Sequence, residues 1–309
     1  GSNKAYFVGN RFRRSVFENL PIPFPKQFVI GLDTQKRDFE EFQAPSYLRG
    51  EWRQGGWWYY YIYGLFVKTT PGAIFLACIV PVVAFQKHFS YKSIGYESQI
   101  GILILISSFL SILFLASSQL EFNHHFRYIL PCYGLIFVGL GCVVHLQMAQ
   151  CLKKLLIIAV TCSCVFSMVS VYPHQLTYYN QFVGGPIRGR FHMLGSNYDW
   201  GQNLLLLKEW QIANYIDEPI FLAHNNTYSP SDFGIKNVVS VDSDGTIHGR
   251  IGKSIPKWII ISGNFLVQGR LKSSTWGEKS PNRIPIENYL HTKPECVLGN
   301  TLFVFRYSQ

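Results

Sequence analysis

The sequence predicts a multi-pass α-helical membrane protein with about four transmembrane helices and a C-terminal extracytoplasmic α/β domain. Charged residues make up only 15% of the 309 residues, whereas about a quarter is usual for soluble domains. The apolar residues gather in long uncharged runs, and strand-like runs alternate with helical patterns after residue 172. We therefore divide the chain into an extracytoplasmic loop or interfacial region at 1–69, a transmembrane domain at 70–172 and an extracytoplasmic α/β domain at 173–309.

In the first region, aromatic residues gather immediately before the first apolar run. Trp57 and Trp58 are followed by three tyrosines, and Glu51 precedes them. Trp and Tyr are enriched where a membrane meets water, so this pattern is typical of an aromatic belt. The same residues also suit a sugar or an acceptor, because aromatic faces stack on sugar rings and a carboxylate binds hydroxyl groups. Both interpretations are open at this point.

Four apolar runs predict membrane spans. The third run has no Asp, Glu, Lys or Arg from Tyr128 to Gln147, and these roughly 20 residues are enough for a helix to cross a hydrocarbon core of about 30 Å. The first run is interrupted by Pro71, and Lys68 at its start either snorkels to the interface or faces a cavity. The expected spans are about 70–86, 99–118, 127–147 and 154–172.

The placement of lysines predicts the side on which each loop lies. Lys87 and Lys92 follow the first span, and Lys153 and Lys154 precede the fourth. By the positive-inside rule these two loops are cytoplasmic, so both long polar regions and the short loop at 118–126 are extracytoplasmic. The net charge is +10, but the basic residues are scattered, and we expect no nucleic acid among the partners.

The C-terminal region has the pattern of a small α/β layer. Asn203–Asn214 fits a helix, and Asp199 and Gln202 are placed to form a capping box before it. Short runs rich in β-branched and aromatic residues follow. The expected strands are Ile220–Ala223, Val238–Val241, Trp258–Ser262 and Leu302–Phe305.

Several short motifs occur along the chain in a defined order. They are Tyr47-Leu48-x-Gly50-Glu51, Lys68-Thr69, Arg127-Tyr128-x-Leu130-Pro131, Tyr178-Tyr179-Asn180, Gly184-Gly185-Pro186 and Ser196-Asn197-Tyr198-Asp199-Trp200-Gly201-Gln202. In these segments the chain resembles the C-terminal part of bacterial membrane glycosyltransferases of the GT-C superfamily, in the dolichyl-phosphate-mannose protein mannosyltransferase-like group. The resemblance extends over most of the chain.

The resemblance implies a multi-pass enzyme of the bacterial cytoplasmic (inner) membrane. Such an enzyme transfers a hexosyl or pentosyl group from a polyprenyl-phosphate-linked donor to an extracytoplasmic acceptor, which is a protein, a lipid or a glycan. Inversion at the sugar needs a carboxylate base, and the leaving phosphate needs positive charge. In the family the base is an Asp of the first extracytoplasmic loop; no segment here matches that loop, so we expect the base upstream of Gly1. We predict no cofactor; a divalent metal is an option that no motif supports.

The polar edge of the third span supplies the first substrate-binding candidates. Arg127 either contacts the donor phosphate through charge-assisted hydrogen bonds or only positions the helix at the interface. His124 and His125 either donate to the phosphate, bind a metal with Glu121, or are loop residues at the interface. Lys68 either faces the carrier phosphate or snorkels. Nearby positive charge is what an anionic partner requires.

The remaining candidates come from the aromatic cluster and from the most recognisable motif. Glu51, Trp57 and Trp58 are expected to bind the sugar or the acceptor unless they form a belt. Asp199 and Gln202 are expected either to bind substrate or to serve only as a helix cap.

A second function class is a non-enzymatic membrane protein, either a transporter or a subunit that binds a lipid-linked glycan. A transporter is expected to contain broken helices and paired charges within the membrane. The spans here are nearly free of charge, and polar groups gather at one interface. This pattern favours chemistry or binding at the outer surface.

Overall fold

The computed structural model describes residues 15–16, 21, 23–41, 45–83, 96–118, 123–145, 148–224, 228–248, 255–268 and 283–307. The chain forms two compact units, residues 1–44 and 45–309. The boundary between the units lies within the region 1–69 that the sequence predicts as one segment, because residues 46–53 pack with the larger unit. Lys87, Lys92 and Glu121, on which parts of the predicted topology and metal site depend, lie outside the described residues.

Among the described residues of the smaller unit, Lys26–Glu41 form a helix, α1. It begins directly after Pro25, whose carbonyl oxygen accepts hydrogen bonds from the backbone N–H groups of Phe28 and Val29. The rings of Phe24 and Phe28 lie 5.6 Å apart. The region 1–69, predicted as an extracytoplasmic loop or interfacial region, thus contains a helix of 16 residues.

The larger unit begins with a short hairpin and a sharply bent pair of helices. Strands β1 (Ser46–Leu48) and β2 (Glu51–Arg53) pair in antiparallel fashion. The chain bends by 113° between helices α2 (Tyr60–Lys68) and α3 (Pro71–Val83). Proline favours the first position of a new helix, where its missing N–H costs nothing, so Pro71 marks the bend.

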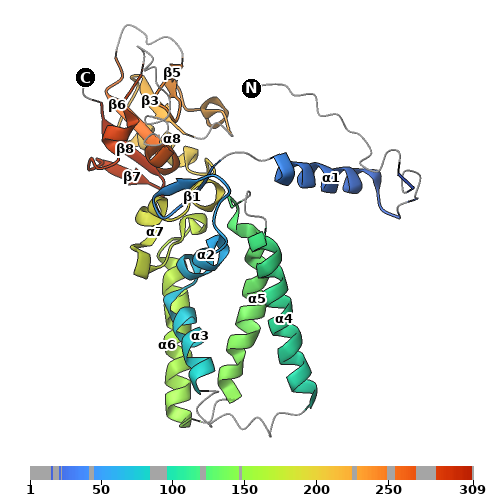
Figure 1. Ribbon diagram of the computed structural model, residues 1–309. Helices are drawn as coiled ribbons and strands as arrows, with labels where there is room; N and C mark the ends of the chain where they lie inside the picture. Colours follow the sequence, from blue (N-terminus) through green and yellow to red (C-terminus); the bar gives the residue numbers. More distant parts are fainter. Residues whose placement is uncertain are drawn as a thin grey trace. The chain divides into compact units, whose positions relative to one another are not determined.

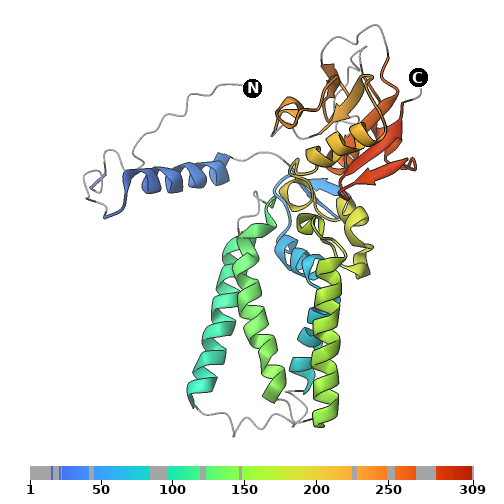
Figure 2. The same ribbon diagram turned by 180° about the vertical axis from the view of Figure 1, so that it is seen from behind.

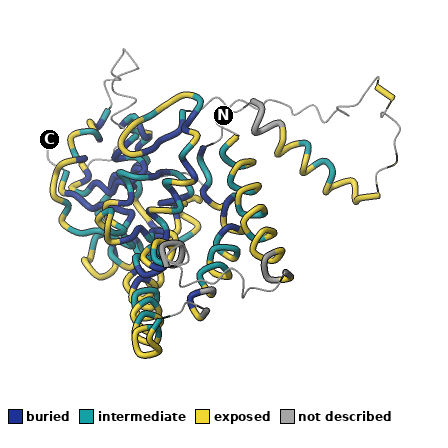
Figure 3. Tube along the Cα trace, turned by 60° about the horizontal axis from the view of Figure 1, so that its bottom comes forward, coloured by how far each residue is buried: buried dark blue, intermediate teal, exposed yellow. Residues whose placement is uncertain are grey.

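Three more helices complete the apolar part, namely α4 (Tyr96–Ser118), α5 (Leu130–Leu140) and α6 (Gln150–Val169). The short 3₁₀ segments η4 (Phe126–Ile129) and η5 (Gly141–His145) flank α5. Figure 1 shows α4 beside α5 and α3 beside α6, and both pairs are in contact. The long helices present mostly exposed and intermediate positions (Figure 3).

Length and composition allow two of the described helices, α4 and α6, to cross a membrane. Each has an apolar stretch of 19 or 20 residues. The bent pair α2–α3 would make a third span if it is counted as one, and the apolar helix at 126–140 is shorter. Helices therefore occupy all four predicted spans, but only two of these helices are long enough to span a membrane alone.

A segment of short turns connects α6 to the α/β domain. It contains η6 (Gln175–Thr177), η7 (Gln181–Val183), α7 (Gly185–Arg188), η8 (Gly189–Phe191) and η9 (Gly195–Asn197). Its hydrogen bonds reach back to α2: the Asn180 amide N–H donates to the carbonyl of Val67, and the Asn180 side chain donates to the carbonyls of Phe66 and Thr69. Asn180 thereby caps the C-terminal end of α2. Figure 2 shows this segment from behind, between the sheet and the helices.

The domain that follows contains a six-stranded mixed sheet in the order β5-β4-β3-β6-β8-β7. Central strand β3 is parallel to both β4 and β6, with Ile220 opposite Val238 and Trp258, while the other pairs are antiparallel. The strands are β3 (Ile220–Ala223), β4 (Val238–Val241), β5 (Ile247–His248), β6 (Trp258–Ser262), β7 (Cys296–Leu298) and β8 (Leu302–Arg306). Other elements are α8 (Leu204–Ala213), η10 (Pro230–Phe233) and η11 (Ile286–Tyr289).

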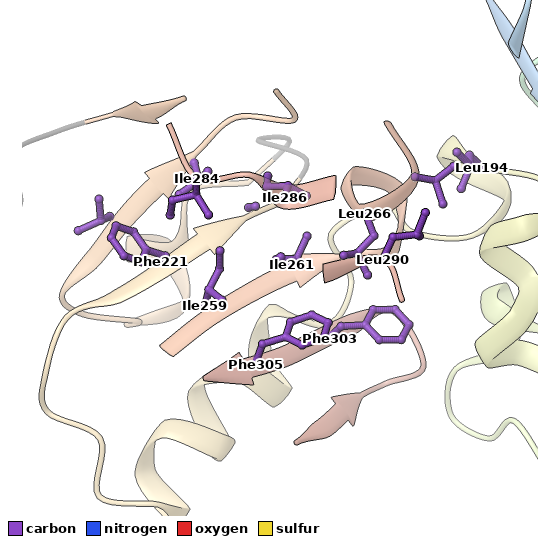
Figure 4. Close-up of a cluster of buried hydrophobic side chains, with 14 of the residues drawn as sticks. Leu194, Phe221, Ile259, Ile261, Leu266, Ile284, Ile286, Leu290, Phe303 and Phe305 are labelled. Atoms are coloured by element: carbon purple, nitrogen blue, oxygen red, sulfur yellow. The ribbon is translucent and has the colours of Figure 1, made fainter. Parts of the chain in front are cut away.

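Apolar side chains cover both faces of this sheet. Alternate residues of a strand point to opposite faces, so Ile220 and Leu222 pack with α8, whereas Phe221 lies in the cluster on the other face. Figure 4 shows this second cluster, in which Phe221, Ile259 and Phe303 lie together. Burial on both faces explains why the strands read as continuous apolar runs.

A third cluster joins the helices to the connecting segment. It contains residues from the stretch between β1 and the end of α2, from η4 and α5, and from the turns before α8, namely Leu48, Trp57, Tyr60, Tyr61, Val67, Phe126, Ile129, Cys132, Tyr179, Met193 and Tyr198. Much of the predicted aromatic belt is thus an internal core: Trp57, Tyr60 and Tyr61 are buried. The predicted helix and the four predicted strands of the α/β layer are confirmed, each to within one residue at its ends.

Candidate functional site

A pocket of about 420 Å³ opens where the apolar helices meet the connecting segment. Four stretches far apart in the sequence form it: the end of α2, η4 with the start of α5, the turns after α6, and η9 with the residues that follow. The lining residues are Lys68, Phe126, Arg127, Leu130, Tyr133, Gln175, Leu176, Tyr178, Ser196, Asn197 and Trp200. Two of the predicted candidates, Lys68 and Arg127, therefore line one cavity.

Lys68 is held at the pocket by the connecting segment. Its Nζ donates to the carbonyl oxygens of Asn197 at 2.7 Å and of Leu176 at 3.0 Å. It also lies 3.8 Å from the centroid of the Tyr179 ring, within range of a cation–π contact. No salt bridge to Lys68 is present among the described residues. Because an ammonium group has three N–H donors, one remains for a ligand. Burial lowers the pKa of Lys68 to about 7, and an anionic ligand in the cavity would favour its charged form.

Arg127 provides the second cation. It lies in η4, is exposed, and its guanidinium carbon lies 5.5 Å from the centroid of the Tyr128 ring. Within the described part of the chain it makes no hydrogen bond or ion pair, and it lines the cavity. A planar guanidinium with free donors matches a carboxylate or phosphate by two parallel hydrogen bonds.

His125 lies at the rim rather than among the residues that line the pocket. Its Nδ1 is 2.5 Å from the Oγ of Ser196, and its ring packs edge-on against Trp200 at 6.4 Å between centroids. Burial, together with the nearby charges of Arg127 and His124, lowers the pKa of His125 to about 4. The ring is therefore neutral at pH 7, so it orients Ser196 and Trp200 and adds no charge.

The side chain of Asn197 connects segments that form the pocket through hydrogen bonds. Its Nδ2 lies within hydrogen-bond distance of Tyr60 Oη and of the carbonyl oxygens of His124 and Leu194, at 2.8–3.0 Å. Its Oδ1 accepts from the amide of Phe126 at 2.8 Å. One buried side chain thus joins α2, the loop before η4 and η9. The sequence candidates did not include Asn197; its only signal was its place in the motif that begins at Ser196.

The aromatic cluster does not reach the pocket. Trp57 is buried, and its amide donates to the Oδ1 of Asn123 at 2.6 Å, so it serves as a core residue and is available to neither a lipid belt nor a sugar. Trp58 is exposed, and Glu51 is exposed on β2. Neither lines the cavity.

Asp199 has a structural role, but not the predicted one. The residue is buried; its Oδ1 accepts from the amide of Gly201 at 3.0 Å, and its Oδ2 accepts from the hydroxyl of Ser262 at the end of β6. Burial raises the pKa of the Asp199 carboxyl, and these hydrogen bonds oppose the rise. The side chain ties the motif to the sheet, one residue before Trp200 of the pocket.

The predicted capping box of Asp199 and Gln202 is wrong. Helix α8 begins at Leu204, and its N-cap, Asn203, makes no side-chain cap hydrogen bond. Gln202 instead accepts from the amide of Trp200 at 2.7 Å and is exposed. The carboxylate of Asp199, which the capping box would have needed, instead accepts a hydrogen bond from Ser262, 63 positions along the chain.

Metal ligands do not converge in the described ranges. No group of three His, Cys, Asp or Glu side chains there is placed to hold an ion. The proposed partner of His124 and His125, Glu121, lies outside those ranges.

Comparison of the chain with protein-family models, with curated proteins and with solved structures finds no match.

Proposed function

We propose that the chain is the C-terminal portion of a GT-C-type glycosyltransferase, and that its pocket holds the phosphate of a polyprenyl-phosphate-linked sugar donor. The observation that carries the proposal is the convergence of Lys68 and Arg127, which are 59 positions apart in the sequence, on one cavity with an apolar wall. The sequence motifs that resemble this family place residues in the same cavity: Lys68, Arg127, Ser196 and Trp200.

The charges suit a leaving phosphate. When the bond between sugar and phosphate breaks, negative charge grows on the phosphate oxygens. Cations fixed nearby therefore stabilise the transition state more than they stabilise the ground state. Lys68 is already oriented by two carbonyl groups, and no described residue forms a hydrogen bond or ion pair with Arg127. The residues of this chain would thus bind the phosphate and stabilise its departure. We assign no general base to the described residues.

The apolar wall suits a lipid chain. Phe126, Leu130 and Leu176 line the cavity beside the cations, and both Leu130 and Leu176 are exposed. We propose that the four predicted spans, which contain α3, α4, α5 with its flanking η4 and η5, and α6, cross the bacterial cytoplasmic membrane. The α/β domain and the acceptor then lie on the extracytoplasmic side. In that placement a donor lipid enters the pocket sideways from the bilayer.

The test is transfer of a labelled sugar from a polyprenyl-phosphate donor by the full-length protein in membranes. Loss of charge-assisted hydrogen bonds in Arg127→Ala is expected to lower kcat/KM by about 10- to 100-fold. Arg127→Lys is expected to retain part of the activity, and Arg53→Ala, which removes an exposed arginine of β2, is the matched control. Equal and negligible transfer by wild type and Arg127→Ala would contradict the proposal. Arg127-dependent binding of the donor without any transfer would instead indicate a glycan-binding subunit or transporter.

A further inference from the structure

Large apolar side chains are exposed on the segment that follows α6. Tyr172 is 73% exposed, Phe182 64% and Ile187 47%, although all three belong to the well-packed connecting segment. Isolated exposed apolar residues are ordinary, but several on one short segment indicate a contact surface.

The exposed side chains continue an apolar surface that begins on α6. Phe166 and Val169 are exposed in the last turns of that helix, and Tyr172 follows three residues after Val169. The hydrogen bonds of Asn180 place η7 against the end of α2, where Phe66 is 45% exposed. Figures 1 and 2 both show α7 near the C-terminal end of α6.

A positively charged side chain lies next to these exposed apolar residues. Arg188, the last residue of α7, is exposed, directly after Ile187. Apolar side chains next to an exposed arginine match the boundary of a bilayer, where acyl chains end and lipid phosphates begin.

We propose that Phe66, Tyr172, Phe182, Ile187 and Arg188 form a collar surface that lies in the headgroup layer of the bilayer, with Arg188 on the phosphate of an anionic lipid. The apolar side chains enter the acyl region beside the end of α6. This inference rests on the membrane placement of α6 proposed above, and it is independent of any transferase activity.

The experiment measures how lipid and water reach chosen side chains of the full chain in nanodiscs of phosphatidylglycerol and phosphatidylcholine. A nitroxide is attached through a genetically encoded ketone amino acid, so that the seven cysteines stay in place. Labels replace Phe182 and Ile187 on the collar surface, Ile158 on α6 as the lipid reference, and Tyr215, which is 91% exposed, as the water reference. Collision with oxygen reports lipid, and collision with a water-soluble nickel complex reports water.

The labels at 182 and 187 are expected to resemble the one at 158, with nickel collisions several-fold below those at 215. Nickel collisions equal to those at 215 would overturn the collar while the label at 158 still reports lipid. A water-exposed label at 158 would overturn the membrane placement itself. Weak collision with both reagents at 182 and 187 would show a protein partner on this surface and would also overturn the proposal.

A comparison of two substitutions tests whether the charge of Arg188 contacts lipid phosphate. With the label at 182, Arg188→Glu is expected to raise nickel collision in nanodiscs rich in phosphatidylglycerol, because the carboxylate is repelled by lipid phosphate. Arg188→Lys is expected to leave it unchanged. An unchanged signal in Arg188→Glu would overturn the assignment of Arg188 to lipid phosphate.

Discussion

At the residue level, Asn197 joins three parts of the pocket through one amide. Its Nδ2 and Oδ1 lie within hydrogen-bond distance of groups of Tyr60, His124, Leu194 and Phe126. A buried polar group left without its partner costs about 1–3 kcal/mol. Asn197→Ala leaves several such groups unpaired, so it should destabilise both the fold and the site.

We expect Asn197→Ala to lower the free energy of unfolding by at least about 2 kcal/mol. Asn214→Ala removes an exposed amide with one hydrogen bond to the carbonyl of Trp210, and it should change stability by less than about 0.5 kcal/mol. Denaturant titration of the two variants in the same detergent measures the difference. Equal stabilities would show that the Asn197 contacts contribute little.

His125 predicts a pH dependence of stability. Its pKa is about 4 in the folded protein and about 6.5 in an unfolded chain. Between these values the unfolded state binds more protons, so acidification from pH 6.5 towards 4 favours unfolding. His125→Asn should reduce the slope of the unfolding midpoint against pH in this window. The same slope in wild type and variant would exclude His125 as a source.

At the level of elements, helix α8 is attached to the sheet mainly by apolar packing. Leu207 is fully buried among Ile220, Leu222 and Ile260, whereas Leu205 on the same helix is 55% exposed. We expect Leu207→Ala to lower the free energy of unfolding by about 2–5 kcal/mol. Leu205→Ala should change it by less than about 0.5 kcal/mol. Similar losses in both variants would mean that α8 is not docked through this face.

The contact between α3 and α6 depends on the absence of a side chain at Gly72. A Cβ there would lie 2.8 Å from the Cβ of Ser163 and 3.1 Å from the carbonyl oxygen of Val160, whereas Gly101 on α4 has nothing within 4 Å of its Cβ position. The Gly72 amide also donates to the Oγ of Ser163 at 3.0 Å.

Gly72→Ala is therefore expected to lower the thermal unfolding temperature in detergent. Gly101→Ala should leave it unchanged or raise it, since alanine favours a helix over glycine by up to about 1 kcal/mol. A rise in both variants would indicate that the two helices separate readily.

Elements specified by local pattern were the ones that the sequence could predict. The apolar period of α8 and the β-branched run of Trp258–Ser262 need no distant partner to be recognised. Strands β5 and β7 were not predicted, because they have only two and three residues and depend on pairing with β4 and β8. The capping box failed for the same reason, because Asp199 bonds to Ser262 far along the chain.

At the level of the whole molecule, the pocket exists only through packing between distant segments. Lys68 and Arg127 could be singled out because a cation beside an apolar run is conspicuous in a sequence. Asn197 could not, since nothing local distinguishes a polar residue that joins three segments from one in a surface loop. The aromatic cluster was misinterpreted as a membrane-interface belt for a related reason. Trp57, predicted at that interface, is instead covered by the rest of the larger unit.

The order of strands in the sheet has a consequence for biosynthesis. Strand β8 lies between β6 and β7 and pairs along the whole of β6, yet it leaves the ribosome after every other strand of the sheet. Until it arrives, β6 has one open edge, and open edges invite pairing with other chains. A nascent chain that stalls or terminates before Leu302 would therefore be a target for chaperones and proteases, even though its pocket residues have already been made.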